Sequence, residues 1–349
     1  MKKKLISLIY KHKLDAVLIT YWADLFYLTG LEKIYDYWLV INKTGKMKIL
    51  VTEMIYLQLK NKLVNKNIEI IKVENLFKGL AKFIKTNRIN SIGIDSEKML
   101  CCSVEKLQDM IKTVKKIPGL LSQFRIIKSE SEIKLVRKAC SIISVLYYKI
   151  KSCIKPGMTE KYVHKLILDL FYEYNVEPAF DPIVASGPNS ACPHHISSNR
   201  VIKQDDIILI DIGCKYKGYC SDLTRTFFFG KIKTYLLTIY NVVSDAQKQT
   251  VKKIKPGKKV SEIDKCTHNL IAEKGFKKYF IHSTGHGIGI EIHESPGINF
   301  KELNKDKISL KPGMIITIEP GIYVPEIGGV RIEDTILVTK TGYEVLTKA

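Results

Sequence analysis

The sequence predicts an α+β fold in two domains, a smaller α/β domain over residues 1–125 and a larger domain over residues 126–349. Three observations support this prediction: the length of 349 residues, the alternation of strand-like and helix-like segments at the start, and an internal repeat in the remainder. Two domains fit the length at roughly 150 residues per domain. Hydrophobic residues make up 46% of the chain, which is enough for a sizeable core.

Residues 1–125 alternate between strand and helix patterns. Apolar, β-branched runs of strand length occur at residues 16–20, 38–42, 49–52, 68–73 and 91–95. Helical spacing of apolar residues occurs at 55–63 and 76–86. The apolar run Leu5–Tyr10 is too short for a signal-peptide core, so we expect it to begin a cytoplasmic protein as a helix. No stretch approaches the ~18 apolar residues of a membrane span.

A long helix is predicted to open the second domain. Ser129 and Glu132 have the spacing of a capping box, which is typical of a helix start. The helix is expected to run to about Cys153, because Lys155-Pro156-Gly157 follows as a stop.

An internal repeat occupies the rest of this domain. The tetrapeptide Ile-Lys-Pro-Gly at residues 154–157 recurs at residues 254–257. Each copy precedes a predicted helix, with Thr159 and Ser261 as the candidate N-caps. Two such units, each a helix followed by a strand pair, are expected to face each other across a pseudo-two-fold axis.

Each half of the repeat carries two carboxylates. The apolar run 207–211 ends in Asp211, and the run 315–319 ends in Glu319. Asp222 and Glu333 follow these residues by 11 and 14 positions. Since residues i and i+2 of a strand share a face, the predicted partners on one face are Leu209 with Asp211, Thr317 with Glu319, and Arg331 with Glu333.

Carboxylates at the ends of apolar strands would be buried, and burial without compensation is costly. Four of them together would also repel one another. Two divalent cations would neutralise the four charges. The glycine-rich segment 284–289 adds His286, and one imidazole among oxygen ligands suits Mn²⁺, Fe²⁺, Co²⁺ or Zn²⁺ rather than copper.

The histidines are concentrated near these segments. Of the eight histidines, five fall in two stretches marked by glycine and proline: His194, His195, His282, His286 and His293. A lone histidine is usually an ordinary core or surface residue, but this clustering favours a role in a site.

Five segments of the sequence together resemble those of a known family. The segments concerned are Asp211-Ile-Gly, Tyr219-Cys-Ser-Asp222-Leu-Thr-Arg225-Thr, Gly285-His286-Gly287-Ile-Gly289, Ile318-Glu319-Pro320-Gly321 and Val330-Arg331-Ile-Glu333-Asp334. They resemble the pita-bread metallopeptidases, which include methionine aminopeptidase, aminopeptidase P and prolidase. The first 125 residues, with Asp24-Leu-Phe-Tyr-Leu-Thr-Gly30, resemble the N-terminal domain of creatinase and the proline peptidases.

The resemblance implies a dinuclear metal site. Asp211 would chelate one metal ion, His286 and Glu319 would hold the other, and Asp222 and Glu333 would bridge both. Mn²⁺ is the first candidate, with Co²⁺, Zn²⁺ or Fe²⁺ as alternatives. A hydroxide between the ions would attack the peptide bond before proline.

The resemblance also implies catalytic residues. Glu319 would carry the proton to the leaving nitrogen, and Arg331 would orient a carboxylate. His194 and His293 would donate hydrogen bonds to the substrate or the tetrahedral intermediate. His195 stands where the family more usually has glycine, so either of the adjacent pair could be the residue that acts.

Two substrate ranges remain open within this family. A strict Xaa-Pro dipeptidase needs a cation for the carboxylate of a dipeptide. Between His293 and Gly313 there is no arginine, and the lysines are Lys301, Lys305, Lys307 and Lys311. The sequence alone therefore favours an Xaa-Pro aminopeptidase, with the dipeptidase as the alternative.

Three other readings are disfavoured. The N-terminal domain argues against methionine aminopeptidase. The complete set of five metal ligands argues against creatinase and against a non-enzymatic binding module on the same fold. The net charge of +21 raises nucleic acid as a partner, but only six of the 56 basic residues are arginine and the lysines are scattered. We expect proline-containing peptides as partners, no nucleic acid, no membrane, and a homodimer.

Overall fold

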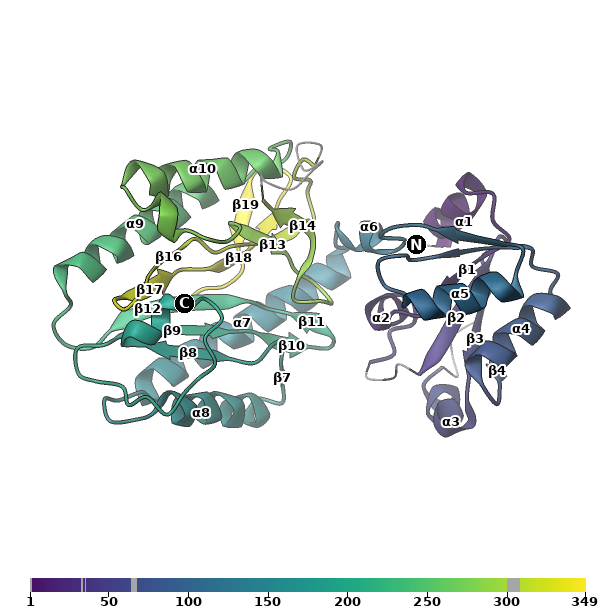
Figure 1. Ribbon diagram of the computed structural model, residues 1–349, viewed down its shortest axis with the longest axis horizontal. Helices are drawn as coiled ribbons and strands as arrows, with labels where there is room; N and C mark the ends of the chain where they lie inside the picture. Colours follow the sequence, from purple (N-terminus) through teal and green to yellow (C-terminus); the bar gives the residue numbers. More distant parts are fainter. Residues whose placement is uncertain (1, 33, 35, 64–67, 300–307) are drawn as a thin grey trace. The chain divides into compact units, whose positions relative to one another are not determined.

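Two separate sheet systems organise the chain, one in each of two compact units, Met1–Phe124 and Arg125–Ala349 (Figure 1). The computed structural model describes residues 2–32, 34, 36–63, 68–299 and 308–349. Within these ranges, no helix combines the length and the apolar character that crossing a membrane requires.

The first unit is built on a six-stranded mixed sheet with the strand order β4-β3-β2-β1-β5-β6. Its strands are β1 (Ala16–Ile19), β2 (Tyr37–Asn42), β3 (Met47–Val51), β4 (Glu69–Lys72), β5 (Ser91–Ile94) and β6 (Thr113–Lys116). Its helices are α1 (Lys2–Lys11), α2 (Trp22–Thr29), α3 (Glu53–Lys62), α4 (Leu76–Thr86) and α5 (Cys101–Met110), and α6 (Ser122–Arg125) leads into the second unit.

Alternate residues of the central strands serve two cores, which is why helices cover both faces of the sheet. Val17 and Leu39 pack with residues of α1 and α3, whereas Leu18 and Val40 pack with residues of α4 and α5. The predicted α/β pattern is thus confirmed for this unit. The sequence reading missed α2, α5 and β6; β6 is a mostly exposed edge strand of sequence Thr-Val-Lys-Lys, which lacks an apolar run.

The described residues of the second unit form four small sheets, with the strand orders β12-β9-β8, β14-β13-β15-β18-β19, β16-β17 and β11-β10-β7. The strands are β7 (Glu177–Pro178), β8 (Ile183–Ser186), β9 (Ile207–Ile212), β10 (Cys214–Tyr216), β11 (Tyr219–Cys220), β12 (Leu223–Phe228), β13 (Gly285–Gly287), β14 (Glu294–Ile298), β15 (Ile315–Ile318), β16 (Gly321–Val324), β17 (Gly328–Arg331), β18 (Asp334–Val338) and β19 (Tyr343–Val345). The helices are α7 (Glu130–Cys153), α8 (Glu160–Glu173), α9 (Thr234–Val251) and α10 (Val260–Glu273), with 3₁₀ turns η1 (Gly187–Ala191) and η2 (Lys277–Tyr279).

The predicted capping box at the start of α7 is confirmed. The Ser129 hydroxyl accepts a hydrogen bond from the Glu132 amide, and the Glu132 carboxylate accepts one from the Ser129 amide. The helix ends at Cys153, as the Lys-Pro-Gly stop predicts.

The internal repeat appears as matched hydrogen bonds in the two halves. The amide of Gly157 donates to the carbonyl of Ile202, and the amide of Gly257 donates to that of Leu310. Both glycines have positive φ, +95° and +85°, which a residue with a Cβ adopts only under strain.

The N-cap of α10 corrects one prediction. Ser261 lies inside the helix, and the capping position belongs to Lys259, which makes no side-chain cap bond. In the first half Thr159 caps α8 by accepting a hydrogen bond from the amide of Tyr162. Thr159 and Lys259 hold equivalent places, because each forms an isolated β-bridge to a residue a few positions before a long apolar strand, Val201 before β9 and Ser309 before β15.

Strand alternation separates a helix-facing surface from an inner surface in each half. On β9, Ile208 and Ile210 pack against α7 and α8, while Leu209 packs with Ile183 and Ala185 on the opposite face. On β15, Ile316 and Ile318 join the core formed with α9 and α10. Asp211 and Thr317 therefore face inward, as the two-residue period predicts.

The repeat provides a test of the capping bond. Replacing Thr159 by alanine should lower the free energy of unfolding by about 1 kcal/mol, because the Tyr162 amide loses its partner. Lys259→Thr should raise it by up to about 1 kcal/mol, because Lys259 already has the extended backbone of an N-cap. Denaturant unfolding at fixed metal concentration measures both, with Lys259→Ala as the control. Equal losses in Thr159→Ala and Lys259→Ala would contradict the assignment.

Candidate metal centre and active site

One cavity in the second unit collects the five predicted metal ligands. Its volume is about 450 Å³, and its lining includes Asp211, Asp222, His286, Glu319 and Glu333. The four carboxylates come from equivalent strand ends. Asp211 is near the end of β9 and Glu319 directly follows β15, while Asp222 and Glu333 directly precede β12 and β18.

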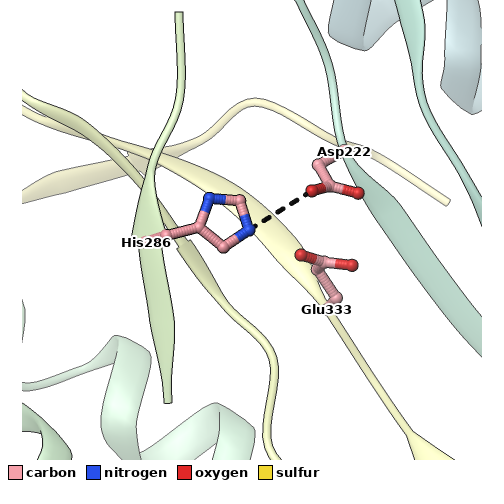
Figure 2. Close-up of side chains that lie close together, drawn as sticks. All are labelled: Asp222, His286 and Glu333. Carbon is pink, nitrogen blue, oxygen red and sulfur yellow. Dashed lines mark ion pairs between the residues drawn. The ribbon is translucent and has the colours of Figure 1, made fainter. Parts of the chain in front are cut away.

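Three of these side chains point at one another across the cavity (Figure 2). The ligand atoms of Asp222, His286 and Glu333 all lie within 4.8 Å of one another. His286 Nε2 is 3.5 Å from Asp222 Oδ2 and 3.3 Å from Glu319 Oε1. The carboxylates of Asp222, Glu319 and Glu333 therefore lie close to the imidazole of His286, so four of the five predicted ligands are neighbours.

The backbone around His286 explains the glycines that flank it. A Cβ on Gly285 would overlap the carbonyl of Thr317, and a Cβ on Gly287 would overlap the carbonyl of Ser295. Only glycine lets β13 lie this close to its neighbours. The carbonyl of Gly287 is 3.0 Å from His286 Nδ1. Since a carbonyl can only accept, Nδ1 carries the proton and Nε2 offers its lone pair to the cavity.

A buried hydrogen-bond network holds the carboxylates. Arg331 Nη2 donates to Asp211 at 2.6 Å, and its Nε donates to the hydroxyl of Thr224 at 3.1 Å. That hydroxyl donates in turn to Glu333 at 2.6 Å. Thr317 donates to Glu319 at 3.3 Å. The predicted shared strand face of Arg331 and Glu333 is replaced by a crossing between sheets, because β17 ends at Arg331 and β18 begins at Asp334.

The carboxylates are in an unfavourable electrostatic environment. Burial raises the pKa of Asp222 well above its ordinary value, and the charges of Glu333 and Asp211 add to the shift. Burial and the charges of Glu319 and Asp211 act in the same direction on the pKa of Glu333. The pKa of Glu319 is also raised, mainly by burial.

Two carboxylate oxygens in this group have no partner in the described structure. They are Asp211 Oδ1 and Glu333 Oε1, both buried. Unpaired buried acceptors on mutually repelling carboxylates, next to an imidazole with its lone pair directed inward, fit divalent cations. Burial lowers the pKa of His286, and the neutral ring is the form that binds metal.

The predicted catalytic histidines line the same cavity. The ring of His293 lies 4.3 Å from that of His286, edge to face, and burial lowers its pKa. His194 and His195 differ in their environment. His195 Nε2 is 2.8 Å from Glu160, whereas no hydrogen bond joins the His194 ring to another described residue, which leaves it available to a ligand.

Hydrogen bonds and ion pairs hold the loop that carries His293. The carboxylate of Glu294 accepts hydrogen bonds from the amides of Ile290 and Glu291, at 3.0 and 3.1 Å. Its other oxygen accepts from Lys128 at 3.2 Å, and Arg125 pairs with Glu291 at 2.5 Å. The loop is thus tied to the segment that precedes α7.

Sequence reasoning missed several residues that shape the site. Tyr323 is one, and its hydroxyl accepts a hydrogen bond from Arg331 at 2.8 Å and lies 2.9 Å from His282 Nε2. Thr224 and Glu160 are others. Thr224 lies two residues after Asp222, within the segment that resembles the family, so this resemblance could have indicated it. Glu160 and Tyr323 lie at no spacing from the other site residues that would predict a place in the cavity.

The comparisons with known proteins cover both units. The model described as metallopeptidase family M24 matches residues 134–340, which is more than half of the chain. The model described as the creatinase/prolidase N-terminal domain matches residues 2–127. These matches confirm the predicted fold, a creatinase-type domain followed by a pita-bread domain.

Individual relatives match along their whole length. The Xaa-Pro dipeptidase of Pyrococcus horikoshii is 40% identical over 99% of this chain and 96% of its own. The solved Xaa-Pro dipeptidase from Bacillus anthracis has a TM-score of 0.93 and 36% identity, covering 100% of this chain and 97% of that one. The X-Pro aminopeptidase from Thermotoga maritima has a TM-score of 0.90 and 29% identity, over 100% and 98% of the two chains. The chain therefore belongs to metallopeptidase family M24 and is a peptidase, a hydrolase of peptide bonds.

Proposed function

We propose that this peptidase is an Xaa-Pro dipeptidase, which hydrolyses the bond before a proline that carries the free carboxylate. The observation that carries the proposal is the set of four buried carboxylates and one inward-facing imidazole, in a chain whose 40% identical relative is named Xaa-Pro dipeptidase. The sequence alone favours the aminopeptidase, and the comparisons support its alternative better. The Thermotoga maritima neighbour keeps the aminopeptidase as the second candidate.

The metal ions would be held by Asp211, Asp222, His286, Glu319 and Glu333. Divalent cations at this place would polarise the scissile carbonyl and lower the pKa of a water molecule. Oxygen ligands with one imidazole suit Mn²⁺, Co²⁺, Zn²⁺ and Fe²⁺. Among these four ions Mn²⁺ is our first choice.

The protein groups around the substrate would act by positioning and proton transfer. Glu319 lines the cavity and would take a proton from water and give it to the leaving nitrogen. His194 and His293 line the cavity from different segments and would donate hydrogen bonds to the developing oxyanion. Arg331 would keep Asp211 in place through their 2.6 Å contact.

The anchor for a substrate carboxylate is a separate question. Lys301, Lys305 and Lys307, which the sequence offers for this role, lie outside the described residues. The homodimer also stays a prediction, which sedimentation of the purified protein would test.

Substrate length tests the proposed function directly. We expect Xaa-Pro dipeptides to be hydrolysed with a higher kcat/KM than the matching Xaa-Pro-Yaa tripeptides, because a dipeptidase gains binding energy from the proline carboxylate. Steady-state kinetics with one metal and a matched first residue give the ratio. A clear preference for tripeptides would restore the aminopeptidase reading.

Metal binding should stabilise the protein more as the pH rises. In the metal-free protein Asp222, Glu319 and Glu333 have raised pKa values, so their stabilising contribution is present below the unfolded-state pKa and is lost as the pH rises through the folded-state values. Cations offset this loss. The increase in Tm on adding Mn²⁺, measured against a chelated sample, should grow between about pH 5 and about pH 8. A pH-independent increase would argue against metal binding at these carboxylates.

Two substitutions separate metal binding from catalysis. Asp222→Asn should lower the metal content, yet the metal-free variant should be at least as stable as the metal-free wild type, because one buried repelling charge is gone. His194→Ala should keep the metal and lower kcat on the order of 100-fold, the usual effect of losing a transition-state donor. Metal analysis, melting and kinetics of both variants check this. Loss of metal in His194→Ala would show that its role is wrongly assigned.

A further inference from the structure

A fully buried carboxylate lies behind the second histidine of the His194-His195 pair. Glu160, the first residue of α8, accepts hydrogen bonds from the amide and hydroxyl of Ser186 at 2.7 Å each, and from those of Ser198 at 3.0 and 2.6 Å. The side-chain amide of Asn189 and His195 Nε2 complete the set, with the latter at 2.8 Å. The network fixes the ring of His195 at the wall of the cavity.

The donor and the acceptor in the Glu160–His195 hydrogen bond can be assigned from the other contacts of Glu160. Burial alone would raise the pKa of Glu160, but the hydrogen bonds from Ser198, Ser186 and His195 lower it overall. The carboxylate is therefore an acceptor, and His195 Nε2 must be the donor. Glu160 occupies Nε2, and among the described contacts no hydrogen bond is formed by Nδ1, which is the ring nitrogen left for a ligand. Nδ1 donates to a ligand carboxylate in the form of the ring that carries both protons.

A dipeptide brings a carboxylate into a cavity whose described lining is rich in acids. Arg331 is the only arginine or lysine among the described residues of that lining, and its guanidinium is already engaged with Asp211, Thr224 and Tyr323. Among the basic side chains of the described lining, the histidines are therefore the ones left to bind a substrate carboxylate away from the proposed metal ions.

The other histidines of the cavity are less suited to this task. His286 directs its lone pair at the carboxylates. His282 uses both nitrogens, one beside the carbonyl of Ser283 and one beside the hydroxyl of Tyr323. His293 lies against His286, one of the proposed metal ligands. The carboxylate that contacts His195, that of Glu160, has no solvent exposure, and the side chain of His195 itself is 14% exposed.

We propose that His195, held by Glu160, binds the free carboxylate of the substrate and so makes the enzyme select dipeptides. The inference rests on the proposed function, because an aminopeptidase would have no proline carboxylate to bind. It gives adjacent histidines different tasks. His194 would serve the reacting carbonyl of every substrate, and His195 would serve the terminal carboxylate alone.

A matched pair of substrates isolates the carboxylate. Xaa-Pro and Xaa-Pro amide differ only in that charge, so kcat/KM for the two reports the anchor. In the wild type we expect the free acid to be favoured. In His195→Gln, whose side-chain amide can still donate to Glu160 but carries no charge, kcat/KM for the acid should fall about 10- to 100-fold, the range for a hydrogen bond to a charged group. The loss should appear mainly in KM, and the amide should change little.

Two control variants exclude general damage. His164→Asn removes a histidine that also contacts a carboxylate, Asp181 at 2.9 Å, with 20% of its side chain exposed, yet does not line the cavity; it should keep the preference for the acid. His194→Ala should lower kcat for acid and amide alike. His195→Asn serves as a second variant if His195→Gln fails to fold, and Tm and metal content are measured for each.

The outcomes separate this inference from the proposed function. A wild type that cleaves the amide as well as the acid would contradict the dipeptidase assignment itself. A wild type that prefers the acid, with the preference unchanged in His195→Gln, would overturn the role of His195 and leave the dipeptidase standing. Equal losses for both substrates in a folded, metal-loaded His195→Gln would likewise overturn it, since His195 would then only shape the loop.

Discussion

The mutual repulsion of four buried carboxylates is the constraint on which the catalytic unit depends. Burial raises the pKa of Asp222, Glu319 and Glu333, so the site favours bound protons or cations. The fold opposes this repulsion with donors from both halves of the repeat. Arg331 and Thr224 connect Asp211 to Glu333 through hydrogen bonds of 2.6 to 3.1 Å. The same bonds join the two halves, so site and fold share their interactions.

Much of the site could be predicted because strand geometry is local. Asp211 and Glu319 end apolar runs of strand length, and the two-residue period places Leu209 and Thr317 on their faces, as the structure has them. The capping box at Ser129 was equally readable, since it needs only neighbours along the chain. Features of this kind are fixed by spacing alone.

The rest depended on contacts between distant segments. Glu160 lies 35 residues from His195, and at the start of a helix it looks like an ordinary acidic residue near the positive end of the helix dipole. Tyr323 meets His282 from 41 residues away. The sequence predicts the N-cap of α10 at Ser261 because serine is a common cap, whereas in the structure Lys259 holds that position. Lys259 also forms an isolated β-bridge with Ser309, a contact between distant segments that a local preference does not predict.

The two halves of the repeat supply equal numbers of carboxylates, but the strand that pairs with the carboxylate-bearing strand differs between them. Beside β15 lies β13, whose glycines let His286 approach the acids. Beside β9 lies β8, which offers Ile183 and Ala185 to the inner face. The half with β13 therefore adds an imidazole to the carboxylates that both halves supply. The half with β8 adds apolar side chains instead, and the amide of Ser186 at the end of β8 donates a hydrogen bond to Glu160. The repeated scaffold is therefore asymmetric at the cavity, with the imidazole of His286 on one side of the carboxylates and the apolar side chain of Ile183 also in the lining.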